Sequence, residues 1–105
     1  MDLTESEQAD LRTILVNIFG QEASTWKMNS GTLKATAEML SEIKSCSQAM
    51  AYVPRPGGVI DSDYFRRQLR NMARRATNHD QIYQICRNTG TLRWKSAIYF
   101  ASERF

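Results

Sequence analysis

The chain has 105 residues, of which 42% are hydrophobic and 24% are charged, and its formal net charge is +3. This length has room for one hydrophobic core, and the apolar content is too high for a disordered protein. No apolar run approaches the roughly 20 residues that span a bilayer, and the acidic start lacks the features of a signal peptide. We therefore expect a single cytoplasmic domain over residues 1–105, with no membrane segment.

Charge is distributed unevenly along the chain. Residues 1–53 carry seven acidic and four basic side chains, whereas residues 54–105 carry four acidic and ten basic ones. The segment between these halves contains two prolines and two glycines, which interrupt helices. These patterns predict an acidic N-terminal half (1–53), a Pro/Gly connection (52–60) and a basic C-terminal half (61–105).

The first helix is predicted over residues 5–19. Thr4 followed by Glu7 has the spacing of a capping box, in which each side chain accepts a hydrogen bond from the other residue's amide. Apolar residues then recur every three or four positions, as on one face of a helix: Leu11, Ile14, Leu15, Ile18 and Phe19. Gly20 follows, and glycine commonly ends a helix in the left-handed conformation.

A second helix is predicted from about residue 30 to about Ala51, with Ser30 or Thr32 as its cap. Its apolar residues cover close to half of the helix circumference, which favours contact with two neighbouring helices. In the preceding segment, we expect Trp26 and Met28 to fill the core from a short helical turn or a loop.

Three further helices are predicted in the basic half, over about residues 62–76, 79–89 and 92–104. The first and last carry apolar stripes, formed by Phe65, Leu69, Met72, Ala73 and Ala76, and by Trp94, Ala97, Ile98, Ala101 and Phe105. No segment shows the strict alternation of a half-buried strand. The sequence therefore predicts an all-α fold, a compact single-domain bundle of four to five short helices in an antiparallel arrangement.

Residue patterns that support catalysis or cofactor binding are missing from the sequence. The single histidine, His79, lies seven positions before Cys86, about 10 Å along a helix axis, which is too far for a nucleophile–base pair. There is no zinc-ligand spacing and no glycine-rich phosphate loop. Cys46 and Cys86 occupy apolar helical positions, where we expect free, buried thiols. We predict a protein that is not an enzyme, with no metal and no cofactor.

The predicted helix at 62–76 carries a cluster of arginines beside its apolar stripe: Arg66, Arg67, Arg70, Arg74 and Arg75. The guanidinium group is a rigid donor fork that suits phosphate and carboxylate groups, so the cluster predicts an anion-binding surface. Three interpretations are open: a partner protein with an acidic surface, a nucleic acid, or a solvated face that the acidic N-terminal half partly neutralises.

The helices predicted at 79–89 and 92–104 have the order and the glycine turn of a helix-turn-helix, here a degenerate one over residues 79–104. The second of them offers Arg93 and Lys95 to phosphates but few side chains for base recognition. With the arginine cluster, these residues make residues 64–95 the alternative, nucleic-acid-binding face.

The last predicted helix is apolar on nearly all sides, because Tyr99 and Phe100 point away from its core stripe. Such a helix either lies centrally in the fold or forms part of an interface. In a domain this small, an interface with another chain or with a second copy is as good an interpretation as burial. Tyrosine and arginine are also frequent in binding hot spots.

We therefore predict a small, non-enzymatic protein–protein interaction module of the adaptor, assembly-chaperone or inhibitor type, binding a partner protein with an acidic surface. The predicted contacts are Arg66, Arg67, Arg70, Arg74, Arg75, Arg93, Lys95, Tyr99 and Phe100. The alternative is a nucleic-acid-binding protein that uses the basic face of residues 64–95. A homodimer is compatible with either.

Overall fold

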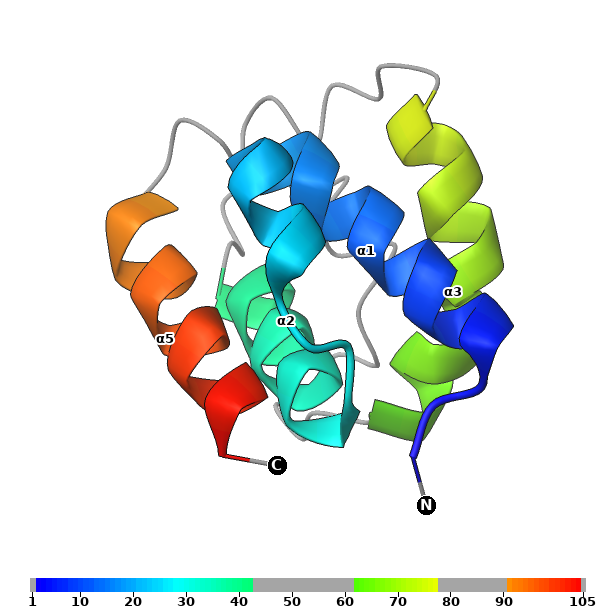
Figure 1. Cartoon of the computed structure of the whole chain (residues 1–105). Coiled ribbons are helices and arrows are strands. Elements are labelled where there is room, and N and C mark those ends of the chain that lie inside the picture. The colour runs from blue at the N-terminus through cyan, green and yellow to red at the C-terminus, as the bar shows by residue number, and fades with distance from the viewer. Residues whose placement is uncertain (1, 43–61, 78–90, 105) are drawn as a thin grey trace.

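The structure is a computed structural model that describes residues 2–42, 62–77 and 91–104 (Figure 1). These residues form an all-α single domain, as predicted, with the α-helices α1 (Glu5–Phe19), α2 (Ser30–Glu42), α3 (Ser62–Thr77) and α5 (Thr91–Glu103) and the 3-10 helix η1 (Gln21–Thr25). Several predictions fall outside the described residues: the second helix beyond residue 42, the connection at 52–60, the helix at 79–89, and the residues Cys46, His79, Cys86 and Phe105.

Local sequence sets both ends of α1, as predicted. Thr4 Oγ1 accepts a hydrogen bond from the Glu7 amide at 3.1 Å, and the Glu7 carboxylate accepts one from the Thr4 amide at 2.8 Å. These bonds pair two of the amides that a helix start leaves open. Gly20 at the other end has the expected positive φ, 95°, but its ψ of −175° is extended rather than left-handed helical. This conformation is almost exclusive to glycine, and it leads the chain directly into η1.

The start of α2 is capped by Asn29, so the prediction of Ser30 or Thr32 was wrong. Asn29 Oδ1 accepts a hydrogen bond from the Thr32 amide at 3.0 Å, and the Asn29 amide donates to the Thr32 hydroxyl at 3.5 Å. Asn29 is therefore the N-cap residue, and Thr32 takes the third helical position of a capping-box arrangement. The error is small because Asn, Ser and Thr have similar capping preferences.

The core lies where the apolar faces of the described helices meet. Its largest fully buried apolar side chains are Leu11, Ile14, Leu15, Met39, Leu40, Phe65, Leu69, Met72 and Ile98. Trp26 and Met28, each 4% exposed, fill the core from the segment between η1 and α2, which confirms their predicted role. The predicted stripe of α3 is also confirmed through Ala73, which is buried.

The predicted antiparallel arrangement holds for α2 and α5 but not for α1 and α3. The carbonyl of Ser102, near the end of α5, accepts a hydrogen bond from a side chain that precedes α2. In contrast, Glu7 of α1 pairs with Arg66 of α3. One turn further along both helices, Asp10 pairs with Arg70, so α1 and α3 run in roughly the same direction (Figure 1). These two helices are not consecutive in the chain, so no short loop forces them to be antiparallel.

The buried side of α5 differs in part from the predicted stripe. Ile98 is fully buried, and Trp94 and Ala101 pack partly against the core. Ala97, expected in the core, is exposed, whereas Ser102 is fully buried. Ser102 tolerates burial because its hydroxyl donates to the Tyr99 carbonyl at 2.6 Å and its own carbonyl is hydrogen-bonded.

Candidate functional site

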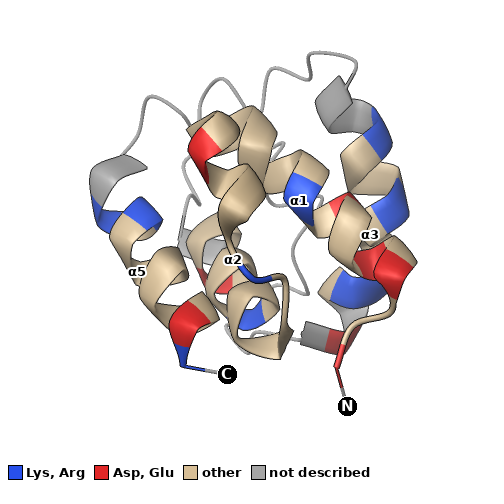
Figure 2. Cartoon of the chain, in the orientation of Figure 1, with Lys and Arg blue, Asp and Glu red and all other residues tan. Residues whose placement is uncertain are grey.

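Two of the predicted anion-binding arginines on α3 are paired within the chain. Arg66 donates two hydrogen bonds to the Glu7 carboxylate, from Nε to Oε2 at 2.5 Å and from Nη2 to Oε1 at 2.7 Å. Arg70 Nη2 donates to the Ser6 hydroxyl at 3.0 Å, and its Nε lies 3.5 Å from Asp10 Oδ2. Figure 2 shows the basic residues of α3 beside the acidic start of α1. The acidic N-terminal half thus neutralises part of the arginine cluster.

The Glu7–Arg66 pair shifts the pKa values of both residues. The pKa of Glu7 is lowered from 4.5 to about 2, chiefly by the hydrogen bonds from the Arg66 guanidinium and next by the one from the Thr4 amide, against an opposing effect of burial. The pKa of Arg66 is raised, chiefly by its hydrogen bonds to Glu7. The bidentate geometry is the strong form of such a pair, and it joins α1 to α3 across 59 positions of the chain.

We expect Glu7→Gln to weaken the fold at neutral pH and to remove part of its acid sensitivity. A glutamine still accepts the bond from the Thr4 amide, so the variant isolates the loss of charge, which we expect to cost about 1 kcal/mol for a partly exposed pair. Because the folded-state pKa of Glu7 lies below the unfolded value, its contribution is present above about pH 5 and is lost as the pH falls toward 2.

Urea unfolding at several pH values measures this difference. Glu5→Gln is the matched control, because Glu5 is an exposed acid in the same first turn. We expect the wild type and Glu5→Gln to lose stability on acidification more steeply than Glu7→Gln. Parallel pH profiles for all three proteins would contradict a stabilising role for the Arg66 pair.

The remaining described arginines of α3 face solvent. Arg67 and Arg74 are exposed, and Arg74 Nη2 donates to the Asn71 side chain at 2.6 Å. The side chain of Arg75 lies outside the described residues. The exposed basic surface of α3 therefore includes Arg67, Arg74 and the outer part of Arg70, whose side chain is 66% exposed. It is smaller than the predicted cluster.

The second predicted contact region, on α5, presents two exposed aromatic side chains. Tyr99 is 41% exposed and Phe100 is 63% exposed, and these are the exposed large hydrophobic residues in the described part of the chain. Tyr99 packs edge-on against Trp26, with ring centroids 6.1 Å apart, and Phe100 lies 5.8 Å from Tyr99. Phe19 continues this row behind Trp26, at 5.6 Å. The row runs from the core to the surface, and Phe100 is its outermost ring.

Two polar contacts join α5 to other parts of the fold. Asn29 Nδ2 donates to the Ser102 carbonyl at 3.0 Å, and both residues are buried. On the other side of the aromatic row, Lys95 pairs with Glu22 of η1 at 2.7 Å. Arg93 lies over the Trp94 ring, 5.1 Å from its centroid. Lys95, predicted as a phosphate contact, thus already has a carboxylate partner.

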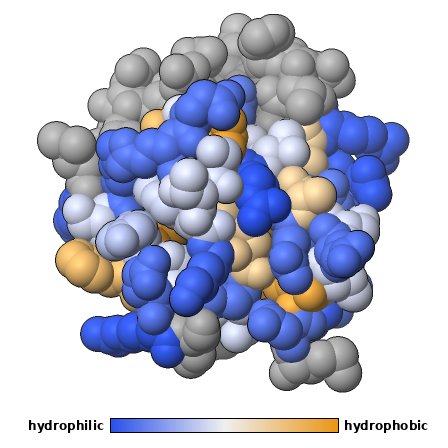
Figure 3. All heavy atoms as spheres, viewed as in Figure 1, coloured by the Kyte–Doolittle hydropathy of each residue, from blue (hydrophilic) through white to orange (hydrophobic). Residues whose placement is uncertain are grey.

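The structure separates the two sets of predicted contact residues. α3 and α5 lie on opposite sides of the domain, with α2 between them (Figure 1). In the space-filling view, apolar atoms protrude at the edge formed by α5, whereas hydrophilic atoms dominate the opposite edge (Figure 3). The arginines of α3 and the aromatic residues of α5 therefore form two surfaces rather than one. Apolar periodicity predicted the helices that carry the two sets, but it carried no information on how far apart these helices lie.

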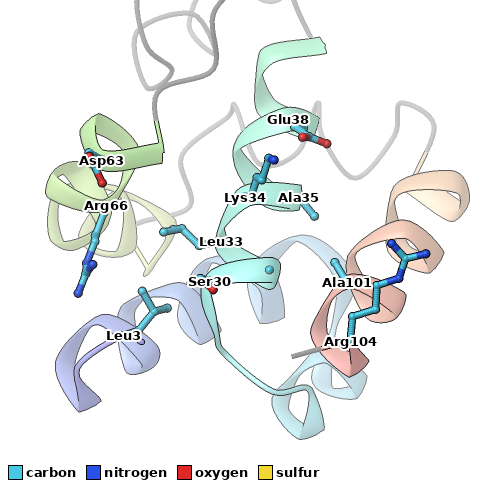
Figure 4. A pocket seen from close by; sticks show the side chains of 11 residues that line it. Leu3, Ser30, Leu33, Lys34, Ala35, Glu38, Asp63, Arg66, Ala101 and Arg104 are labelled. Carbon is cyan, nitrogen blue, oxygen red and sulfur yellow. The ribbon is translucent and has the colours of Figure 1, made fainter. Parts of the chain in front are cut away.

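A groove of about 660 Å³ lies over α2, between α3 and α5 (Figure 4). It is lined by Leu3, Ser30, Gly31, Leu33, Lys34, Ala35, Glu38, Asp63, Arg66, Ala101 and Arg104. Charges of both signs are mixed along it, and Figure 4 shows Arg66 and Arg104 pointing away from each other at opposite ends. Its basic groups therefore do not converge on one anion. No local pattern in the sequence indicates this groove, because its walls come from three helices and the N-terminal segment.

The described residues contain no cluster of three His, Cys, Asp or Glu side chains that could hold a metal ion. None of the helices described is long and apolar enough to cross a membrane. Comparison of the chain with protein-family models, with curated proteins and with solved structures gives no match.

Proposed function

We propose that this chain is a small, non-enzymatic protein–protein interaction module, and that its main recognition surface is the outward side of α5. One observation carries the proposal: Phe100 is 63% exposed although it belongs to a helix that Ile98 and the Asn29–Ser102 hydrogen bond hold to the core on its other side. An exposed aromatic side chain has few rotatable bonds to immobilise on binding, and aromatic residues are frequent among hot-spot residues. A cytoplasmic location and an adaptor, chaperone or inhibitor role belong to this proposal.

The arginines of α3 support this function less strongly than α5 does. Arg66 and Arg70 are oriented by contacts with α1, so a partner that recruited them would have to compete with Glu7 and Asp10. Arg67 and Arg74 are exposed, and neither takes part in these two contacts with the acids of α1. We assign them a secondary surface for acidic groups, on the side of the domain opposite α5 (Figure 2).

Phe100→Ala tests the proposed function. Because the ring is mostly exposed, we expect the melting temperature to change little, whereas binding should weaken at least tenfold, as for a hot-spot residue. The measurement is affinity capture from the native host with quantification of retained proteins, followed by titration of the purified partner. Tyr99 is less suitable, because its ring also packs against Trp26.

Arg67→Ala is the control, since it removes an exposed side chain on the opposite side of the domain. Binding that survives Arg67→Ala but not Phe100→Ala supports the α5 surface. Binding that Phe100→Ala leaves unchanged would contradict it, and a loss with Arg67→Ala alone would assign recognition to α3.

The exposure of Arg67 and Arg74 keeps nucleic acid as a second candidate ligand. Fluorescence anisotropy with labelled duplex and single-stranded nucleic acid at two salt concentrations tests it. Phosphate contacts would give affinity that falls steeply with salt and is lost in the double variant Arg67→Glu, Arg74→Glu. Absence of binding at low salt would remove this candidate.

A further inference from the structure

We infer that the partner of the α5 surface is a second copy of this chain, with the two α5 helices packed antiparallel across a two-fold axis. This inference rests on the proposed function and names the occupant of the same surface. It follows from the pattern of residues on the outward side of α5, which is complementary to itself in one orientation only.

The outward side of α5 carries a straight seam of four exposed residues: Arg93, Ser96, Phe100 and Glu103. Their spacing of three, four and three positions is that of a helix seam that packs against another helix. With about 100° of rotation per residue, the seam lies opposite Ile98, which is fully buried. The seam therefore points directly away from the core, where a second helix can approach it.

The order of residues along the seam favours an antiparallel pair. A two-fold axis beside residue 98 places Arg93 opposite Glu103 of the partner subunit, and Ser96 opposite Phe100 of the partner subunit. Each contact occurs twice, as in any isologous interface. The pairing joins opposite charges at both ends and sets a large ring against a small side chain in the middle. Parallel pairing would instead set Arg93 against its own copy and Glu103 against its own copy, which is unfavourable.

The expected dimer is weak and reversible. α5 has 13 residues and is therefore about 20 Å long, so a two-helix contact lies at the small end of specific interfaces. Each copy also keeps its own core, because the seam residues are exposed and none of them is among the buried core residues. We expect a dissociation constant of about 10–100 µM for folded monomers.

Charge exchange between two variants tests the arrangement. Arg93→Glu alone sets glutamates against each other at both ends, and Glu103→Arg alone sets arginines against each other. Each variant should raise the dissociation constant at least about tenfold, because every substitution changes two contacts. An equimolar mixture should form a heterodimer, since each end then has one glutamate and one arginine. Sedimentation velocity from about 10 µM to about 500 µM covers the expected affinity range.

The two variants should fold normally. Glu near the start of a helix and Arg near its end both match the helix dipole, so the circular dichroism and melting temperature should be retained. Phe100→Ala should also be monomeric over the same concentrations. Glu5→Gln, at an exposed position at the start of α1, should dimerise like the wild type.

The results of these experiments distinguish the proposed dimer from the proposed function as a protein–protein interaction module. A wild type that remains monomeric at the highest concentration overturns the dimer, while Phe100-dependent capture of another protein would still support the interaction module. A wild-type dimer that neither charge variant weakens overturns the antiparallel α5 contact. Dimers of the mixture alone, with both single variants monomeric, support the inferred geometry.

Discussion

Phe65→Ala should destabilise the domain by about 3–5 kcal/mol, the range measured when a large buried aromatic residue is truncated. Phe65 is fully buried in α3, on the side of that helix that packs into the core. The substitution removes the transfer free energy of the ring and leaves a cavity that the neighbouring side chains can fill only in part. The total free energy of unfolding of a domain of this size is roughly 5–15 kcal/mol, so the substitution would remove a large share of its stability.

Thermal and urea unfolding measure this loss, with Arg67→Ala as the matched control two positions further along the same helix. We expect the control to change the free energy of unfolding by less than about 1 kcal/mol, because the arginine is exposed. A Phe65→Ala variant that unfolds within the same margin would show that α3 does not pack through this face.

Asn29→Ala is expected to destabilise the domain by about 2–3 kcal/mol, because it affects both the start of α2 and the end of α5. The side chain caps the Thr32 amide at 3.0 Å and donates to the Ser102 carbonyl at 3.0 Å. All three residues are buried, so the groups left behind have no access to water as a substitute partner. Hydrogen exchange should rise in the last turns of α5 before it rises in α1.

Asn29→Asp separates the two contributions of this side chain. Aspartate retains an oxygen that caps the Thr32 amide but loses the donor for the Ser102 carbonyl. We expect Asn29→Asp to weaken the packing of α5 against the domain, whereas the N-terminal cap of α2 is retained. Phe100-dependent binding should then weaken, because α5 has lost its hydrogen bond to Asn29. Ser30→Ala, at an exposed neighbouring position, should have little effect. Wild-type exchange rates in α5 of Asn29→Asp would contradict the role of this hydrogen bond in docking the helix.

Local patterns in the sequence predicted the helices of the described residues well. The bounds of α1 follow from Thr4, Glu7 and Gly20, which act within one turn of the helix end. The predicted range 62–76 agrees with α3 to within a residue, and 92–104 does so with α5. Capping and apolar periodicity depend on neighbours three or four positions away, so they are readable without the fold.

The candidate surfaces could be predicted only in part. Periodicity separated Phe100 from the buried side of α5, and its exposure agrees with that separation. It also placed Ala97 in the core, where Ser102 lies instead. This difference has a distant cause, because Asn29 bonds the Ser102 carbonyl across 73 positions of the chain.

By itself, the sequence determined the helical class, the bounds of α1, α3 and α5, and the excess of arginine in the C-terminal half. Only the tertiary structure decided that Arg66 and Arg70 pair with the acids of α1, and that the arginines of α3 and the aromatic residues of α5 lie on opposite sides of the domain. The physical reason is the range of the interactions. Helix propensity, capping and periodicity act over a few residues, whereas ion pairs and side-chain packing depend on which helices meet, and no local pattern encodes that.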